Sequence, residues 1–180
     1  AGVEAMAGDL PKARRLLAEA GYRGEKVVAL HAGDYPMISA GGQVGADLLR
    51  RMGFNVDLVT LEYAAINQRR NSRNPPGQGG WNVFFGPFNG YNRYDPAAHV
   101  GINPAFSGWV PVDEIQALRD RWFETPDLAG RQAIARDIQL LVWRDVPYIP
   151  LGSFFPLTAF RSNLEGVMGG GATFFNVRLV

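Results

Sequence analysis

The sequence predicts an α/β fold. Three segments have the composition of strands, at about 26–31, 55–61 and 82–86, and helical segments lie between them. Strands that alternate with helices are typical of units whose strands pair in parallel. With 180 residues, of which 47% are hydrophobic and 19% charged, the chain is long enough to form one domain or a large part of one.

Two helices are expected beside the first strand. Asp9 is a suitable N-cap for a helix with Pro11 in its first turn, and Gly21 is a suitable residue to end it. A second helix is expected over about 38–52, ended by Gly53. The residues expected to face the core are Ala13, Leu16, Leu17 and Ala20 in the first helix and Val44, Leu48, Leu49 and Met52 in the second.

The second strand precedes a short helix and a loop. Residues 54–61 alternate apolar and polar side chains, which is typical of a strand with one buried face. A short helix is expected over 63–70. Residues 71–80 are rich in Asn, Pro and Gly, so we expect a flexible surface loop that leads into the third strand.

Two further helices are expected in the second half of the chain. Asp113 and Gln116 have the spacing of a capping box, and Thr125 is a suitable hydroxyl cap for a last helix that ends near Val146. The residues expected to be buried are Ile115, Leu118 and Trp122 in the first of these helices and Ile134, Ile138, Leu141 and Val142 in the second. After them, prolines favour an extended segment at 148–151, and the glycines at 169–171 are typical of a linker.

The segment 81–96 is the most informative part of the chain for function. A short apolar run ends in a loop of aromatic rings, amides and Gly/Pro turns, the mixture expected in a small-molecule pocket. The alternative is an Ω-type loop that packs on its own aromatic rings. Ligands bind at the carboxyl ends of strands in such sheets, and the loops 33–37 and 86–95 both follow strands. The candidate ligand-binding residues are Phe88, Asn89, Tyr91 and Asn92, with Tyr35, Met37 and Phe154 as further candidates, whereas Asp95 is expected to brace the turn.

Several kinds of chemistry have no support in the sequence. The net charge is +1, and basic residues alternate with acidic ones, so we expect no nucleic-acid partner. The chain has no cysteine, and neither His31 nor His99 has the spacing of a metal ligand, so no metal, cofactor or catalytic residue is expected. The glycines between Gly41 and Gly45 lack the lysine of a phosphate-binding loop, and close helix packing explains them better.

Four pieces of the sequence, in this order, resemble a known family. They are 13–22 (ARRLLAEAGY), 45–56 (GADLLRRMGFNV), the Tyr94-Asp95-Pro96 element, and 131–151 with its VPYIPL end. This order is similar to the C-terminal part of solute-binding protein family 5, the peptide and nickel class that serves ABC importers. The resemblance covers almost the whole chain.

The resemblance implies one lobe of a two-lobed periplasmic binding protein of the cluster C type, with a mixed sheet flanked by helices. Residues 1–163 would be the C-terminal α/β lobe, without the N-terminal part of that lobe, and 164–180 a tail that returns towards the other lobe. The implied partners are a peptide or peptide-like small molecule, the permease subunits of an ABC transporter, and the N-terminal lobe of the same protein. The implied location is the periplasm, or outside the cell on a lipid anchor, and the chain carries no signal peptide at Ala1.

One position departs from the family pattern. Peptide-binding members have an Asp, in the loop after the strand equivalent to 83–85, that pairs with the ligand's ammonium group. The loop 86–92 of this sequence has asparagines where that acid could stand. An amide brings no charge, which would weaken a contact worth about 1.5–3 kcal/mol, so the resemblance suggests a ligand without a free ammonium group.

Two other functions stay open on the sequence alone. One is a small α/β enzyme domain, a hydrolase or transferase, which would need a nucleophile and a base within hydrogen-bond distance. In this case a Ser or Asp should contact His31 or His99 in a cleft. The other is a protein-interaction module that uses an exposed aromatic patch.

Overall fold

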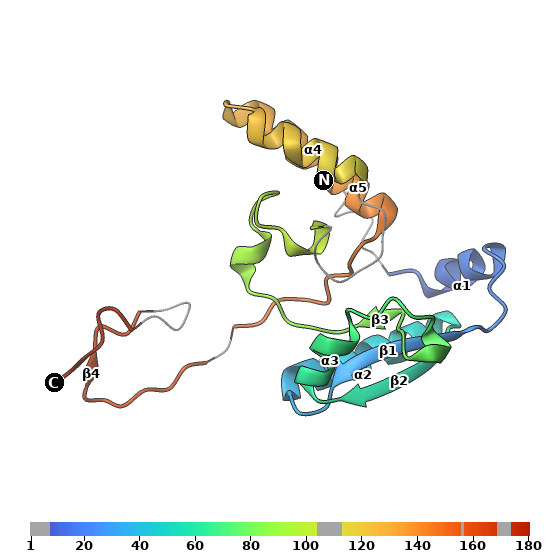
Figure 1. Ribbon diagram of the computed structural model, residues 1–180, viewed down its shortest axis with the longest axis horizontal. Coiled ribbons are helices and arrows are strands. Elements are labelled where there is room, and N and C mark those ends of the chain that lie inside the picture. Colours follow the sequence, from blue (N-terminus) through green and yellow to red (C-terminus); the bar gives the residue numbers. More distant parts are fainter. Residues whose placement is uncertain (1–7, 104–112, 156, 169–173) are drawn as a thin grey trace.

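The computed structural model describes residues 8–103, 113–155, 157–168 and 174–180 (Figure 1). The first half contains α1 (Leu10–Glu19), β1 (Lys26–Ala32), α2 (Pro36–Met52), β2 (Asn55–Leu61), α3 (Tyr63–Arg69) and β3 (Val83–Phe84). The second half contains α4 (Asp113–Glu124), α5 (Leu128–Asp145), β4 (Leu164–Glu165) and β5 (Arg178–Leu179). Short 3-10 turns lie at Pro76–Gln78, Gly90–Arg93 and Val100–Ile102.

The main sheet has the strand order β2-β1-β3 and is parallel throughout. Lys26 pairs with Asn55 at one end of β1 and Ala32 pairs with Leu61 at the other. The predicted parallel pairing is therefore confirmed. The expected mixed sheet is not present in the described residues, because the antiparallel strands β4 and β5 pair with each other in a separate ribbon.

β1 is the centre of the first hydrophobic core. Val28, Leu30 and Ala32 form a buried cluster that includes Ile66 of α3 and against which Phe84 of β3 packs. Full burial of an aliphatic side chain such as Leu30 contributes about 1.5–3 kcal/mol to stability. Because β1 is buried on both faces, it reads as a continuous apolar run.

Helix α2 covers the other face of the sheet through its small residues. A Cβ atom added to Gly42 would lie 2.6 Å from the Cβ of His31, and one added to Gly45 would overlap the ring of Phe85. The expectation of close helix packing at these glycines is therefore confirmed. The helix approaches the strands so closely that no larger side chain fits between them.

This packing contradicts the prediction that Val44 and Leu48 of α2 face the core, whereas the other two predicted residues, Leu49 and Met52, are half-buried. Val44 is 70% exposed and Leu48 is 41% exposed, while the buried residues of the helix are Ile38, Gly42, Gly45 and Ala46. Contact through glycine and alanine turns the larger apolar side chains outwards. In α1 the prediction holds only in part, since no residue of that helix is fully buried and Leu16 is 50% exposed, while Ala13 and Leu17 are half-buried.

Helices α4 and α5 form an antiparallel pair with a second core. Ile115, Ile134 and Ile138 are buried together with Ile102, which comes from the preceding loop. The remaining predicted residues, Leu118, Trp122, Leu141 and Val142, pack against this cluster, so the apolar faces predicted for both helices are confirmed.

The caps of these two helices differ from the predictions. Asp127, and not Thr125, caps α5 by accepting a hydrogen bond of 2.7 Å from the Gly130 N–H. The Thr125 hydroxyl instead donates to the carbonyl of Arg121 at the end of α4. Gln116 forms no capping box, because its amide donates to the Ile102 carbonyl at 2.6 Å.

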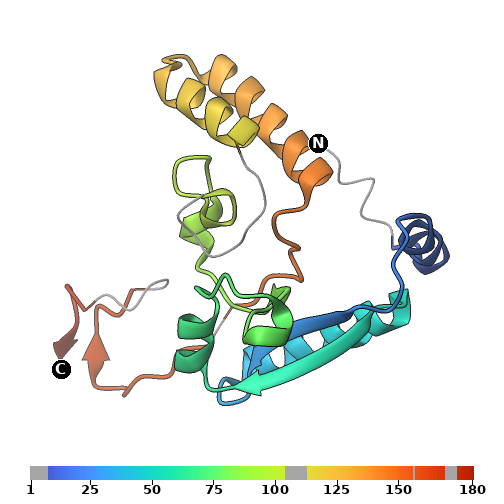
Figure 2. The same ribbon diagram turned by 45° about the vertical axis from the view of Figure 1, so that its right-hand side comes forward.

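The C-terminal arm, defined here as the described residues between 149 and 180, runs from the end of α5 towards the sheet and then turns away from the sheet and from the helical pair to the side where β4 lies (Figures 1 and 2). Its first residues have no regular secondary structure, which agrees with the prediction that 148–151 are not a central strand. The predicted glycine linker at 169–171 lies outside the described residues. Among the helices of the described residues, none has the length and hydrophobicity needed to cross a bilayer.

Candidate functional site

The carboxyl ends of β1, β2 and β3 meet at one edge of the parallel sheet. The loop after β1 is tied there to the start of α3, because the Asp34 carboxylate accepts a hydrogen bond of 2.9 Å from the Tyr63 N–H. The rings of Tyr35 and Tyr63 pack with their centroids 5.9 Å apart. Tyr63 was absent from the predicted site, although its place directly after a strand could have indicated it.

Two predicted site residues lie at this edge. Tyr35 is the N-cap residue of α2 and is 41% exposed, and Met37 in the first turn of the same helix is 42% exposed. Both side chains are therefore accessible to a ligand. Asn89 follows β3 with an exposed side chain that forms no hydrogen bond with the described residues.

The loop after β3, defined here as the site loop, covers residues 86–103. Phe88 is half-buried, and the guanidinium carbon of Arg93 lies 5.0 Å from the centre of its ring. Tyr91 and Asn92 belong to the 3-10 turn Gly90–Arg93, and their side chains lie outside the described part of the structure. Asp95 accepts a hydrogen bond of 2.9 Å from the Ala98 N–H, which confirms that it braces the turn.

Arg93 also stacks on Tyr148, the residue that leads out of the helical pair. Its guanidinium carbon lies 4.8 Å from the centre of the Tyr148 ring, so two aromatic rings flank one cation. Such contacts contribute about 0.5–1 kcal/mol at exposed positions and more where water is excluded. Nothing in the sequence pattern indicates this arrangement, because Tyr148 lies far from Phe88 and Arg93 along the chain.

His99 completes this cluster. Its Nδ1 accepts a hydrogen bond from the Gly101 N–H at 3.2 Å, and its Nε2 lies 3.0 Å from the Tyr148 hydroxyl oxygen. Burial of the ring is the main cause that lowers the pKa of His99, and the positive charges of Arg93 and Arg119 lower it further. The neutral imidazole is therefore favoured in the folded state.

Helix α4 holds the middle of the site loop. The Arg119 guanidinium donates to the carbonyl of Pro96 at 2.7 Å and to that of Ala97 at 3.1 Å. Gln116 binds the Ile102 carbonyl from the same helix. The site loop therefore begins at the sheet and is anchored on the helical pair.

Phe154 is the candidate that comes from the C-terminal arm. It is 51% exposed. Among the described residues, no hydrogen bond or ring contact joins it to the site loop or to Tyr35. The other candidates belong to the segments that follow β1 and β3 in the chain.

The histidine contacts do not have the form expected for an enzyme. His31 is 3% exposed, and its Nε2 lies 2.7 Å from the Thr60 hydroxyl, its partner in the β1–β2 register. In the residues that the structure describes, neither histidine contacts a Ser or Asp, and no three metal-ligating side chains gather. The His31–Thr60 hydrogen bond joins two strands under α2.

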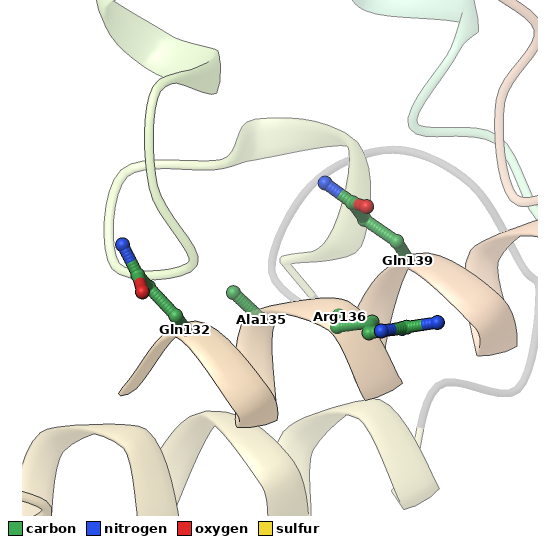
Figure 3. Close-up of a pocket in the computed structure, with 4 residues that line it drawn as sticks. All are labelled: Gln132, Ala135, Arg136 and Gln139. Carbon is green, nitrogen blue, oxygen red and sulfur yellow. The ribbon is translucent and has the colours of Figure 1, made fainter. Parts of the chain in front are cut away.

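A surface hollow on α5 does not coincide with the predicted site. It is lined by Gln132, Ala135, Arg136 and Gln139, whose side chains project from one face of the helix (Figure 3). No residue of the sheet or of the site loop lines it. We therefore base the site on the sheet edge and the site loop.

Comparison with curated proteins identifies a relative of this chain. It is 35% identical over 165 residues to a probable peptide ABC transporter periplasmic-binding protein of Sinorhizobium fredii strain NBRC 101917 / NGR234. The match covers 89% of this chain but only 31% of the relative's length. No protein-family model matches the chain.

Solved structures show the same fold. The ABC transporter substrate-binding protein CtaP from Listeria monocytogenes matches with a TM-score of 0.63 and 19% identity over 76% of this chain and 28% of that one. NikA from Brucella suis, in complex with Fe(III)-EDTA, matches with a TM-score of 0.59 and 22% identity over 79% of this chain and 32% of that one. A periplasmic oligopeptide-binding protein from Thermotoga maritima matches with a TM-score of 0.58 and 19% identity. This match covers 79% of this chain and 30% of that one.

These proteins are binding proteins of transport systems and not enzymes. The sequence match and the shared fold agree with the family indicated by the four sequence pieces. The chain is therefore similar in sequence to a binding protein of a peptide ABC transporter and shares the fold of such proteins, and it spans about a third of the length of the relatives that it matches.

Proposed function

We propose that this chain is the C-terminal lobe of a solute-binding subunit that delivers a peptide or peptide-like small molecule to an ABC importer. Residues 1–163 would form most of that lobe, and 164–180 would return towards the other one. The observation that carries the proposal is the 35% identity to a probable peptide ABC transporter periplasmic-binding protein. The whole protein would act in the periplasm, or outside the cell on a lipid anchor, and would dock on permease subunits.

The proposed ligand site is the sheet edge together with the site loop. Phe88, Asn89, Tyr91 and Asn92 would contact the ligand from that loop. Tyr35 and Met37 would contribute from the loop after β1, and Phe154 would contribute from the arm when the lobes close. Exposed aromatic and amide groups at the carboxyl ends of parallel strands support this assignment.

The proposed mode of action is non-covalent capture. Two lobes that close by a hinge would enclose the ligand and exclude water from its polar contacts. Half of the contacts would then come from parts of the protein beyond this chain. This agrees with a site that is accessible at its edge and lacks a nucleophile-base arrangement in a cleft among the described residues.

Two measurements on the full-length protein test the proposal. Native mass spectrometry would identify retained ligands, and calorimetry with a peptide panel and other small solutes would give their affinities. We expect peptides to bind, with Asn89→Ala and Tyr91→Ala each weakening the best one about tenfold, since each removes a polar contact. Unchanged affinity in both variants would contradict the site assignment, and binding of other solutes only would contradict the peptide ligand.

A further inference from the structure

Arg93 is a cation whose hydrogen-bonding groups are unused within the described structure. Its guanidinium is held between the rings of Phe88 and Tyr148, at 5.0 and 4.8 Å from their centres. No hydrogen bond or ion pair to a described residue involves its N–H groups. The side chain is only half-buried, so these donors can reach a molecule outside the loop.

The surroundings of Arg93 carry no compensating negative charge at ion-pair distance. The nearby Arg119 donates to the carbonyls of Pro96 and Ala97 and to the side-chain oxygen of Gln116, all of which are neutral. The acid of the site loop, Asp95, accepts a backbone N–H and forms no ion pair among the described residues. Of the seventeen acids in the chain, only Glu4 lies outside the described residues.

The state of His99 agrees with this positive environment. Both arginines help to lower the pKa of the imidazole, so two guanidinium charges, Arg93 of the loop and Arg119 of α4, act on a neutral ring. A guanidinium between two rings keeps its planar edge free and loses little rotational freedom when it binds an anion. Carboxylates match that edge with two parallel hydrogen bonds.

We propose that Arg93 recognises a carboxylate of the captured molecule and thereby makes the site loop selective for anionic peptides. This inference rests on the proposed peptide-binding function. The carboxylate could be the C-terminus of the peptide or an Asp or Glu side chain. The two sources present the same chemistry to Arg93 and are separated by the choice of peptides.

The experiment compares matched peptides by calorimetry on the full-length protein. One pair is N-acetyl-Ala-Phe-Ala with a free and with an amidated C-terminus. The other is N-acetyl-Ala-Asp-Ala-amide against N-acetyl-Ala-Asn-Ala-amide. Each peptide is acetylated because the asparagines of the loop 86–92 suggest a ligand without a free ammonium group. We expect the wild type to bind the carboxylate member of at least one pair about ten- to a hundredfold more tightly, and the pair that discriminates identifies the source of the carboxylate.

Substitutions of Arg93 test whether this residue causes the preference for the carboxylate member of a pair. Arg93→Gln should bind both members of the discriminating pair equally, and Arg93→Lys should keep part of the preference because it keeps the charge but loses the planar edge. Arg136→Gln, which removes an exposed arginine of α5 away from the site loop, should behave as the wild type. Thermal melting of each variant verifies folding, and Arg93→Lys carries the test if Arg93→Gln does not fold.

The outcomes separate the inference from the function on which it rests. If peptides bind but neither pair discriminates, or if the Arg93 variants keep the full preference, the role of Arg93 is wrong and the proposed function stands. If the wild type binds no peptide of any kind, the proposed function fails and the inference falls with it.

Discussion

Gly42 of helix α2 lies directly against His31 of β1. An added Cβ atom would lie 2.6 Å from the Cβ of His31, an atom that cannot move without its backbone. Alanine normally stabilises a helix by about 0.5–1 kcal/mol relative to glycine, but overpacking of a core costs about 1–3 kcal/mol. We therefore expect Gly42→Ala to lower the free energy of unfolding by about 1–2 kcal/mol, as measured by urea denaturation.

Gly41 is a matched control for this substitution. It is the preceding residue of the same helix, and an added Cβ atom would have no neighbour within 4 Å. Gly41→Ala should stabilise the chain by about 0.5–1 kcal/mol. Equal effects of the two substitutions would show that close contact with His31 does not decide the position of α2.

His99 makes stability depend on pH. Because its pKa is lowered in the folded state, the unfolded chain binds more protons around pH 6 than the folded chain does. Its contribution to stability is therefore complete above the ordinary histidine pKa of about 6.5 and is lost as the pH falls through the lowered folded value. The slope for one proton is at most about 1.4 kcal/mol per pH unit.

The measurement is urea unfolding of the wild type and of His99→Gln at pH 7.5, 6.5 and 5.5. Carboxylates titrate alike in both proteins, so their effect cancels in the difference. We expect the wild type to lose more stability than the variant between pH 7.5 and 5.5. Parallel pH profiles would exclude a role for His99 in this dependence.

The site loop is held by hydrogen bonds from helix α4. Arg119 donates hydrogen bonds to two of its carbonyls, and such bonds from a charged group contribute about 1.5–3 kcal/mol. We expect Arg119→Ala to destabilise the protein by about this amount and to increase amide hydrogen exchange in residues 95–102. Exchange in β1 should change little, because its core does not include Arg119.

Arg121 provides the control for that experiment. It lies on the same helix, and its exposed side chain forms no hydrogen bond or ion pair with the described residues. Arg121→Ala should leave both stability and loop exchange nearly unchanged. If Arg119→Ala has as little effect as the control, α4 does not anchor the site loop.

At the level of the whole molecule, the C-terminal arm exposes much apolar surface. Phe155 is 91% exposed and Leu157 is 101% exposed. Contiguous apolar surface of this kind marks a place where another part of a protein binds. The chain corresponds to 31% of its relative's length, and we expect the remaining part of the full-length protein to cover the arm.

Phe155→Asp tests this expectation in two backgrounds. In the full-length protein it should lower the free energy of unfolding by about 2 kcal/mol or more, because a charge would enter an apolar contact. In the 180-residue chain the change should stay within about 0.5 kcal/mol, since the side chain is exposed there. Ser162→Asp adds the same charge at an exposed polar position of the arm. Similar small effects of Phe155→Asp in both backgrounds would show that the arm stays uncovered.

The amino-acid pattern alone was sufficient for much of the architecture. Parallel strands separated by helices, the buried faces of α4 and α5, and the close packing at Gly42 and Gly45 all agree with the structure. These features depend on local periodicity or on residue size, which a sequence displays directly. The order of the family-like pieces likewise indicated the family that the curated relative supports.

Features that depend on contacts between residues far apart in the sequence were decided only by the tertiary structure. The orientation of α2 follows from contact with His31 and Phe85, and that contact exposes the apolar Val44. The cap at Asp127 and the cation between Phe88 and Tyr148 follow in the same way from the final positions of several side chains. Spacing along a chain predicts which face of a helix is apolar. Only the packing of helices and strands against each other decides which polar group contacts which neighbour, because those contacts join residues that are far apart in sequence.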